Sequence, residues 1–467
     1  MKPLRIVLWA LKSTVKPLYV AVVPRDVRER LWKYRHQEAW HDWQVPLLAP
    51  RYWPERARSI RRFQAEVAQR QSNYRGTVVF PPSVLWDVPL FQRPQQMAIA
   101  FARLGYLVVY WEDISVSWPE YQIRQVRDGI FAVRMPARAL RTLVDPLVIS
   151  YTYNCDTAIQ LSHSKVVYEF IDHLDIFSNF SRSVLEANHA RLLREAVIVV
   201  GTADDLLNTV REDRADAILV PNGVDYDLFA GANATVPEDM RAIVEQGKPI
   251  VGYYGALAEW FDYDLIAYLA RAMPDCNFVL IGPAYDESLA RSSIQDVPNI
   301  SLMGKRDYRT LPGYLRTFSV ATIPFQLSEA IQAVSPIKLF EYMAGGKPIV
   351  TSDMVECRKY PEVLIATTPE EWVVRLREAI ALGQDPAYVE RVRARSLQNT
   401  WVARAQTIVD ALDQQAGHQA GQQANNASQQ AGQQSGGKDA MENTVKKAEK
   451  KAAKQLQPAS ERVAARR

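Results

Sequence analysis

The chain has 467 residues, 48% of them apolar, so it is long enough for two domains of ordinary size, each with its own core. Its net charge of +4 is unevenly spread: residues 1–75 hold 16 Lys and Arg against 6 Asp and Glu, and residues 438–467 hold 9 against 4, so the middle is acidic. This distribution argues against nucleic acid as a partner of the globular part and favours contact of the basic ends with an anionic membrane surface.

The cysteines and the N-terminal apolar run indicate the compartment. Cys155, Cys276 and Cys357 lie far apart, in or beside apolar runs and without metal-ligand spacing, so we expect reduced thiols and no metal site. Residues 6–24 form the longest early apolar run, but two lysines and a proline interrupt it, which fits neither a membrane span nor a signal peptide. We expect a cytoplasmic protein, peripheral at the inner face of the cell membrane.

The first 75 residues form a basic extension that is rich in tryptophan. Five of the eleven tryptophans fall here, among the arginines. Basic residues mixed with Trp, Leu and Val are typical of an amphipathic helix that lies in a membrane interface. The same pattern also fits a helical extension that packs over the first domain with its arginines in solvent. The two interpretations are compatible, and the sequence leaves both open.

Residues 76–221 show apolar runs that alternate with amphipathic segments, which predicts a doubly wound parallel sheet. The expected strands begin with TVVFPP at Thr77 and continue at 106–113, 129–135, 147–151, 165–171, 196–201 and 217–221, with a helix at 93–104. The loop after the first strand holds Trp86, Asp87, Gln92 and Arg93. It lies at the carboxyl end of the sheet, where such folds bind ligands.

A turn-rich junction, VPNGVDYDLF, occupies residues 220–229, and a second set of alternating elements follows within residues 222–411. Its expected strands are 249–255, 277–283, 299–304, 320–325 and 349–352, and its expected helices are 262–272, 311–317 and 369–381. The sequence therefore predicts an α/β protein with two doubly wound, Rossmann-like domains that face each other across a cleft.

The segment VSPIKLFEYMAGGKPIVTS, residues 334–352, carries the clearest functional pattern. Ser335 as N-cap and Pro336 at the first position predict a helix start, whose unpaired N–H groups attract phosphate. Lys338 and Glu341 share the face near that start, so they supply a cation and a carboxylate that can accept hydrogen bonds from a ribose. The pattern suits a nucleoside diphosphate. The alternative is an ordinary capped helix with Lys338 and Glu341 as a solvent-exposed pair.

The C-terminal tail, residues 412–467, is of low complexity. Apart from His418, residues 414–437 are Gln, Ala, Gly, Asn and Ser, which cannot bury enough apolar surface to offset the loss of chain entropy, so we expect disorder. The KKAEKKAAK run that follows is expected to form a basic helix only when bound to a partner.

The segment SPIKLFEYMAGGKPIV resembles the donor-binding segment of bacterial group 1 glycosyltransferases with the GT-B fold, of the polysaccharide and glycolipid assembly type. The first-domain loop WDVPLFQRPQQMA and the junction VPNGVDYDLF also resemble this family, so the likeness covers residues 77–411. The family motif is two Glu residues separated by seven others, of which the second holds the ribose. Glu341 matches that second Glu, but Ala333 stands in place of the first.

The resemblance implies a hexosyltransferase-like enzyme that moves a sugar from a nucleoside diphosphate sugar to a polysaccharide, glycolipid or lipid-linked acceptor. It also implies that the second domain binds the donor, that the first binds the acceptor, and that neither a metal nor a cofactor besides the donor is needed. Family members often place a basic residue in the loop after the first strand of the second domain, whereas this chain has Glu259 and Asp262 there.

The donor phosphates must then be neutralised from elsewhere. Lys338 is the first candidate, followed by Lys305 and Arg306 in MGKRDY, which come after a strand that ends at the same cleft. Lys305 and Arg306 fit a solvated turn equally well.

An inverting transferase also needs a general base for the acceptor hydroxyl. Asp172 and His173, in YEFIDHLDIF, follow a buried strand of the first domain and are the first and second candidates, and Asp87 is the third. The alternative role for Asp172 is to cap the following helix. An enzyme that retains configuration needs no such base, and the sequence does not determine the stereochemistry.

Two other functions remain open from the sequence. A sugar-nucleotide epimerase shares the two-domain layout and would use the same donor without an acceptor. An inactive GT-B scaffold protein is the second rival, suggested by Ala333 and by the basic ends of the chain.

Overall fold

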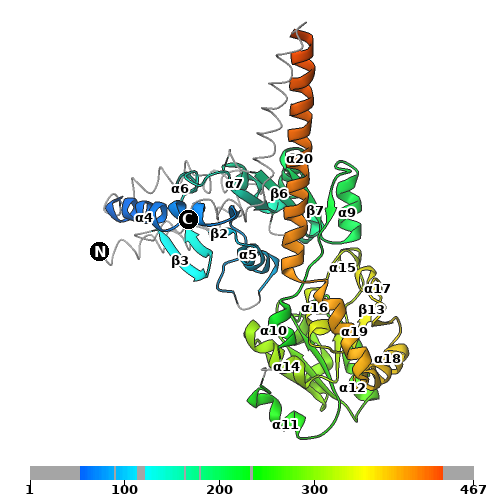
Figure 1. The fold of residues 1–467 in the computed structure, drawn as a ribbon. Coiled ribbons are helices and arrows are strands. Elements are labelled where there is room, and N and C mark those ends of the chain that lie inside the picture. Colours follow the sequence, from blue (N-terminus) through cyan, green and yellow to red (C-terminus); the bar gives the residue numbers. More distant parts are fainter. Residues whose placement is uncertain are drawn as a thin grey trace, which may run out of the picture.

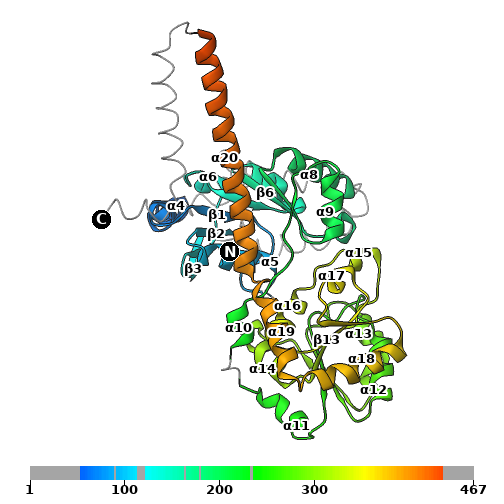
Figure 2. The same ribbon diagram turned by 45° about the vertical axis from the view of Figure 1, so that its right-hand side comes forward.

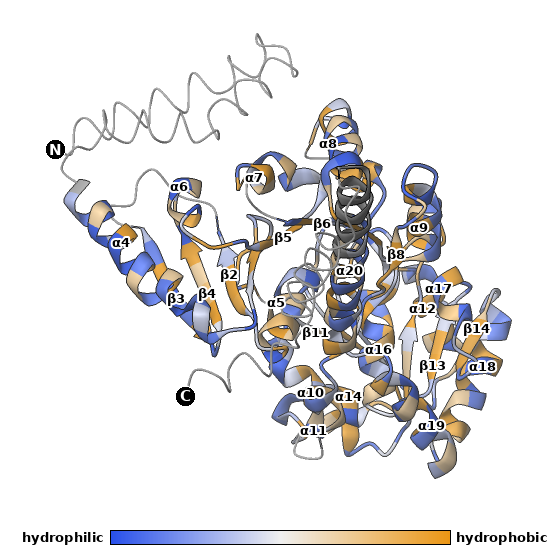
Figure 3. Ribbon diagram, turned by 45° about the horizontal axis from the view of Figure 1, so that its top comes forward, coloured by the Kyte–Doolittle hydropathy of each residue, from blue (hydrophilic) through white to orange (hydrophobic). Residues whose placement is uncertain are grey.

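The computed structural model describes residues 53–88, 91–112, 121–161, 165–177, 180–231 and 235–434. It shows two α/β domains and a long C-terminal helix that starts where the domains meet and then runs along the first domain (Figure 1). Strands of both sheets are largely apolar, while the surrounding helices carry polar residues on their outer faces (Figure 3).

The described part of the first domain contains an eight-stranded sheet with the order β3-β4-β2-β1-β5-β6-β7-β8, in which β3 alone pairs antiparallel. Its strands are β1 (Thr77–Phe80), β2 (Leu107–Trp111), β3 (Gln122–Arg127), β4 (Ile130–Arg134), β5 (Leu147–Ser150), β6 (Lys165–Phe170), β7 (Ile198–Gly201) and β8 (Ile218–Leu219). The strands expected from apolar runs are confirmed. Strand β3 was not predicted, because an edge strand that alternates polar and apolar residues carries a weak signal.

Helices cover both faces of this sheet, so each strand is buried on two sides. They are α4 (Trp53–Glu66), η2 (Ala68–Asn73), α5 (Arg93–Arg103), α6 (Ala137–Leu140), η3 (Thr152–Asn154), α7 (Cys155–Ile159), η4 (Leu174–Ile176), α8 (Arg182–Glu195) and α9 (Asp204–Arg211). The two cores meet at the sheet: Val79 and Val109 face one of them, and the neighbouring Val78 and Val108 face the other.

Helix α4 belongs to the first domain. Phe63 and Val67 are fully buried in its core, whereas Arg58, Arg61 and Arg62 are exposed. For residues 53–75, the interpretation as a helical extension packed over the first domain is therefore confirmed. The rest of the predicted basic extension, residues 1–52, lies outside the described residues.

The second domain contains a six-stranded parallel sheet among the described residues, with the order β11-β10-β9-β12-β13-β14. Its strands are β9 (Ile250–Tyr254), β10 (Asn277–Ile281), β11 (Ile300–Gly304), β12 (Val320–Ile323), β13 (Ile349–Ser352) and β14 (Val363–Ala366). Its helices are α10 (Tyr226–Ala230), η5 (Glu238–Met240), α11 (Arg241–Val244), α12 (Tyr263–Ala272), α13 (Ser288–Arg291), η6 (Ser293–Asp296), η7 (Tyr308–Thr310), α14 (Leu311–Thr317), α15 (Glu329–Gln332), α16 (Ile337–Ala344), α17 (Val355–Arg358), α18 (Pro369–Leu382) and α19 (Pro386–Leu397). The predicted second doubly wound domain is thus confirmed.

Helix α20 (Trp401–Gln434) corrects two expectations. Its first turns pack on α5 through Trp401, Ala405 and Ile408, so residues from 401 onward belong to the first domain rather than to the second. The helix also continues to Gln434, where disorder was predicted. Its packed start removes the cost of nucleation, after which the alanines and glutamines of the segment, which are good helix formers, favour propagation of the helix.

Candidate functional site

Helix α9 follows β7 of the first sheet, and α17 follows β13 of the second. These two helices lie opposite each other where the domains meet (Figure 2), so the carboxyl ends of the two sheets face each other. In the second sheet, β9 and β12 are neighbours, but the chain leaves them in opposite directions, toward β10 and β13. Such a point of reversal is where open α/β sheets bind ligands. Helix α16 lies between β12 and β13 in the chain, so the segment 334–352 that the sequence singled out lies at this point of reversal.

Two glycines make close backbone approach possible at this point. Gly255 follows β9 and Gly282 follows β10, and a Cβ at Gly282 would lie only 1.7 Å from the carbonyl oxygen of Gly255. A Cβ at Gly255 would lie 2.9 Å from Cε of Lys338. The stem of Lys338 therefore packs directly on the backbone at the end of β9, where no larger side chain fits.

Helix α16 begins one residue later than predicted, and its start is not capped by a side chain. Pro336 takes the N-cap position, and the prediction that Ser335 caps the helix is wrong. The Ser335 hydroxyl instead accepts a hydrogen bond from the backbone N–H of Asn222, 3.3 Å away in the junction between the domains. The first N–H groups of α16 thus receive no side-chain acceptor from the N-cap.

Two glycines, Gly345 and Gly346, end α16. Gly346 has φ = 68°, a left-handed conformation, and its N–H donates to the carbonyl of Met343. The N–H of Lys347 then donates to the carbonyl of Tyr342, which completes a Schellman motif.

Lys338 holds its ammonium group between two aromatic rings. The nitrogen lies 4.9 Å from the centre of the Phe325 ring and 5.5 Å from that of Tyr253. Burial lowers the pKa of Lys338 to about 8, and the negative charge of Glu341 opposes part of that shift. No hydrogen bond or ion pair of this ammonium is found among the described residues. The ammonium therefore has no direct ion-pair partner among the described residues, although the Glu341 carboxylate lies near it.

Glu341 is also buried, with 3% of its surface exposed. Burial raises the pKa of this carboxyl group to about 7, while the neighbouring Tyr308 and Tyr254 hydroxyls and Lys338 lower it in part. Both tyrosine hydroxyls lie near enough to the Glu341 carboxyl group to lower its pKa, but outside the geometry of a regular hydrogen bond. The alternative interpretation of Lys338 and Glu341 as a solvent-exposed ion pair is therefore wrong.

An aromatic layer covers Glu341. The Tyr308 ring stacks on Phe91 of the first domain, with centroids 5.6 Å apart and planes at 12°, and it meets Phe229 edge-on at 5.6 Å. Tyr308 is thus held beside Glu341 by rings from both domains. Sequence reasoning missed Tyr308 and Phe91, since nothing in the local pattern brings a residue of the first domain onto one of the second.

The other candidate cations lie at the edge strand β11. Lys305 is exposed. Arg306 is engaged by Asp239, with 2.6 Å between nitrogen and oxygen, and by the Tyr314 hydroxyl at 2.7 Å. The expectation that Arg306 is available for phosphate is thus corrected: its guanidinium already has a carboxylate partner.

The three candidate bases of the first domain are placed differently. Asp87 is exposed and forms an ion pair with Arg124 of β3 at 2.7 Å. Nε2 of His173 lies 2.8 Å from a carboxylate oxygen of Asp205. Asp172 lies just after β6 and makes no hydrogen bond or ion pair within the described chain, so the alternative role as a helix cap is not observed. Burial raises the pKa of Asp172 to about 7, and His173 opposes part of this shift.

An aromatic cluster borders Asp172 and was not predicted. The Tyr153 ring lies 5.3 Å from Phe177 and 5.8 Å from Phe180, all three half-buried at the carboxyl ends of β5 and β6. The exposed Ile176 extends this apolar edge. Aromatic residues after two neighbouring strands were visible in the sequence, but only the parallel pairing of those strands brings them together.

Ala333, at the position of the missing first Glu, is 2% exposed and packs within the first-domain core cluster. The second domain therefore contacts the first through this position. A charged side chain there would have to be buried without a partner, so the substitution by alanine fits the closed contact between the domains.

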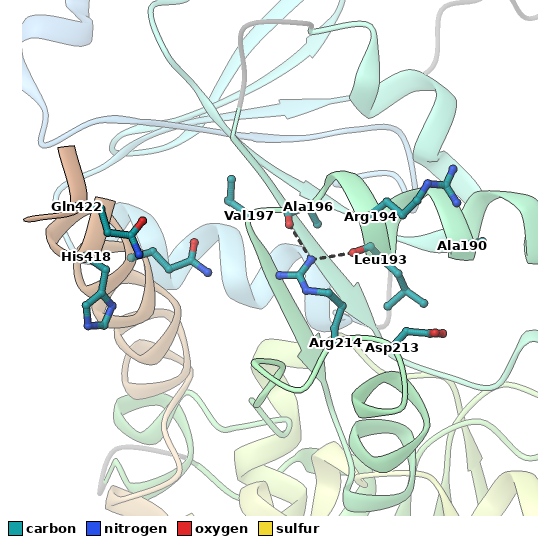
Figure 4. A pocket seen from close by; sticks show the side chains of 10 residues that line it. Ala190, Leu193, Arg194, Ala196, Val197, Asp213, Arg214, His418 and Gln422 are labelled. Atoms are coloured by element: carbon teal, nitrogen blue, oxygen red, sulfur yellow. Dashed lines mark hydrogen bonds between the residues drawn. The ribbon is translucent and has the colours of Figure 1, made fainter. Parts of the chain in front are cut away.

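A hollow of about 820 Å³ in the described chain lies away from the cleft. It sits at the amino end of β7, between α8 and α20, with Arg194, Arg214 and His418 on its wall (Figure 4). Arg214 donates to two backbone carbonyls there. None of the candidate site residues lines this hollow.

The described part of the chain contains no group of three or more His, Cys, Asp or Glu residues placed to hold a metal ion. Among the helices described, none is long and apolar enough to cross a membrane. All three cysteines are free and buried, as expected.

Residues 248–382 match the family described as Glycosyl transferases group 1, and this range includes β9, β12 and α16. Most of the second domain thus matches the group 1 glycosyl transferase family. The matched range contains Lys338 and Glu341, the two residues that the sequence pattern singled out.

Comparison with a curated relative extends the likeness beyond that domain. Over 238 residues, 49% of this chain, it is 27% identical to TuaH of Bacillus subtilis (strain 168), which carries a provisional assignment as a teichuronic acid biosynthesis glycosyltransferase. The matched part spans 59% of the length of that relative.

Solved structures share the GT-B fold of the two domains of this chain. Anabaena Alr3699/HepE in complex with UDP-glucose superposes with a TM-score of 0.54 at 16% identity, covering 72% of this chain and 99% of that one. Sucrose-phosphate synthase from Thermosynechococcus elongatus superposes with a TM-score of 0.53 at 16% identity, covering 72% of this chain and 98% of that one. The α,α-trehalose 6-phosphate synthase from Burkholderia multivorans superposes with a TM-score of 0.54 at 13% identity, covering 74% of this chain and 98% of that one. At these identities the likeness shows the fold.

Proposed function

We propose that this chain is a glycosyltransferase that moves a sugar from a nucleoside diphosphate sugar to a saccharide or lipid-linked acceptor. The observation that carries the proposal is the half-buried Lys338 ammonium, which has no anion partner among the described residues and lies where β9 and β12 diverge. A diphosphate supplies the missing negative charge there. The Anabaena relative holds UDP-glucose, so uridine nucleotides are the first donors to test.

In the proposed reaction, an acceptor oxygen forms a bond to the anomeric carbon while the bond between that carbon and the diphosphate breaks. Negative charge grows on the leaving diphosphate, and Lys338 with the uncapped N–H groups of α16 stabilises it. In an inverting reaction, the Asp172 carboxylate takes the proton of the acceptor hydroxyl. We propose that the transfer is hexosyltransferase-like and needs neither a metal nor a cofactor besides the donor.

The first domain offers the acceptor side. Tyr153, Phe177 and Phe180 present apolar ring surface beside Asp172, and aromatic rings of this kind pack against the apolar faces of sugar rings. The TuaH relative is named for teichuronic acid biosynthesis, which supports a growing glycan as the acceptor.

We also propose that the enzyme works at the cytoplasmic face of the membrane. The exposed arginines of α4, Arg58, Arg61 and Arg62, continue the basic composition of the preceding residues on one side of the first domain. Such a surface attracts anionic lipid headgroups.

The experiment that tests the proposed function is calorimetric titration with UDP, GDP, UDP-glucose and GDP-mannose, followed by product analysis with and without alkyl glycosides as acceptors. Nucleotide binding together with acceptor-dependent transfer supports the proposal. A new nucleotide sugar formed without acceptor would identify an epimerase. Absence of binding to every nucleotide would identify a scaffold and overturn the proposal. Glu341→Ala, which removes the expected ribose contact, serves as the binding control.

A further inference from the structure

All four polar groups of Asn222, in the junction between the domains, are hydrogen bonded. Its backbone N–H donates to Oγ of Ser335 at 3.3 Å, and its side-chain Nδ2 donates to the Ser335 carbonyl at 2.6 Å. Its Oδ1 accepts from Arg93 at 3.2 Å, and its carbonyl accepts from Arg404 at 3.1 Å. One residue thus connects the start of α5, the segment before α16 and helix α20.

The junction is where the chain crosses between the domains twice. Val224, on the first crossing, accepts a hydrogen bond from the N–H of Trp401 on the second, and its own N–H donates to the carbonyl of Asn399. The crossings are so close that a Cβ at Gly223 would lie 2.9 Å from the Asn399 carbonyl oxygen. These crossings form the covalent hinge of the molecule, and Asn222 lies directly before them.

The partners of Asn222 are themselves held in place. Arg93 makes a bidentate ion pair with Glu169 at 2.6 and 3.1 Å, and both side chains are almost fully buried. Ser335 is 4% exposed. Buried bidentate pairs have fixed geometry, because breaking one leaves an uncompensated charge in the interior. The Asn222 amide therefore joins a rigid part of the first domain to the residue just before the N-cap of α16.

We propose that Asn222 is a positioning residue that sets the start of α16, with Lys338 and Glu341, relative to the first domain. The inference rests on the proposed function, in which donor and acceptor are bound by different domains. Atoms that react across a cleft must come within about 3 to 3.5 Å, and a displacement of about 1 Å costs roughly a hundredfold in rate. Loosening the Asn222 contacts should therefore slow the reaction more than it weakens donor binding.

The first test is the kinetics of Asn222→Asp. This change keeps the size of the side chain and its acceptor for Arg93, but it replaces the donor to the Ser335 carbonyl by an oxygen. The control is Asn299→Asp, because the Asn299 Nδ2 also donates to backbone carbonyls, at 2.9 to 3.3 Å, but only inside the second domain.

At a temperature well below both melting points, Asn222→Asp should lower kcat about ten- to a hundredfold, with the UDP dissociation constant within about twofold of the parent. The control should lower the melting temperature while its kcat stays within about twofold. An equal loss of kcat in the control, or an unchanged kcat in Asn222→Asp, would overturn the inference.

The second test needs no activity. Val144 and Val374 lie in different domains and are 75% and 63% exposed, and the native cysteines are fully buried, so Val144→Cys and Val374→Cys accept spin labels. The distance distribution from pulsed electron resonance should broaden or shift in Asn222→Asp and stay unchanged in Asn299→Asp. If the distance distribution broadens in Asn222→Asp but the parent protein transfers no sugar, the proposed function is refuted and the positioning role of Asn222 stands. An unchanged distribution would overturn the positioning role, whatever the activity.

Discussion

The Lys338 ammonium nitrogen lies 4.9 Å from the centre of the Phe325 ring, and nothing in the described chain places a carboxylate within ion-pair distance of it. The negative face of an aromatic ring stabilises a cation by about 0.5 to 2 kcal/mol, which offsets only part of the cost of burying the charge. A lysine held in this way is poorly stabilised in the free protein. It gains most when an anion binds.

Removing this charge should slow the enzyme without weakening the fold. Lys338→Met keeps the stem and the helix propensity, and we expect kcat to fall about a hundredfold, equivalent to about 2.7 kcal/mol. The melting temperature should stay level or rise, because the desolvation cost of the cation disappears. Lys338→Arg should recover only part of the activity, since a planar guanidinium does not fit the place of an ammonium. Steady-state kinetics and thermal melts check this, and turnover within twofold of the parent would contradict it.

Nucleotide binding should take up a proton near pH 8.5. The pKa of Lys338 is about 8 in the free protein, and a bound diphosphate raises it, so a fraction of the lysines becomes protonated on binding. UDP affinity should therefore fall as the pH rises through this range. Titration calorimetry in buffers with different ionisation enthalpies measures the uptake. The Lys338→Met variant should show none of it, and equal uptake in both proteins would assign the proton to another group.

The burial of Glu341 predicts a specific pH dependence of stability. Its pKa is about 7 in the folded protein and 4.5 without burial, so the folded state binds more protons between these values. The contribution is fully present below about pH 4.5 and is lost as the pH rises through 7. Glu341→Gln should remove this dependence and gain at most about 3 kcal/mol relative to the parent at pH 8. Urea unfolding of both proteins at pH 5 and pH 8 compares them, and parallel changes would contradict the prediction.

Asp172 should control the acidic limb of the pH–rate profile. Its pKa of about 7 lies close to the operating pH, where a general base is most effective. Asp172→Asn should lower kcat at least about a hundredfold and abolish the rise in rate through pH 7. Asp87→Asn is the matched control, because Asp87 is exposed and paired with Arg124. The same rise in rate in Asp172→Asn would exclude this base.

Membrane contact is best tested on α4 by neutralising charge. Deleting residues 1–75 would remove Phe63 and Val67 from the first-domain core, so loss of binding after deletion would not be informative. Changing Arg58, Arg61 and Arg62 together to Gln should weaken binding to anionic vesicles at low salt, by up to about 1 kcal/mol per charge.

A control with the same change in net charge comes from the second domain. Arg291, Arg375 and Arg391 are exposed there, and their replacement by Gln should leave vesicle co-sedimentation near the parental level. Equal losses in the two triple variants would indicate an effect of net charge alone and would rule out α4 as the contact surface.

The sequence by itself determined the two Rossmann-like domains, because apolar runs bounded by turn residues mark strands that are buried on both faces. It also determined that Lys338 and Glu341 share one face of a helix, since a spacing of three residues is a local property of helices. The glycines that end this helix were predictable for the same reason, because a left-handed residue is needed at that position.

Only the tertiary structure decided how these residues are surrounded. Ser335 looked like a helix cap, but it bonds to Asn222, which is 113 positions earlier in the chain. Phe91 covers Tyr308 from another domain, and helix α20 returns to the first domain after its chain has left it. Contacts between residues distant in the sequence depend on strand order and domain closure, which leave no periodic signal in the chain. They also set the pKa of Glu341, because burial there comes from several elements at once.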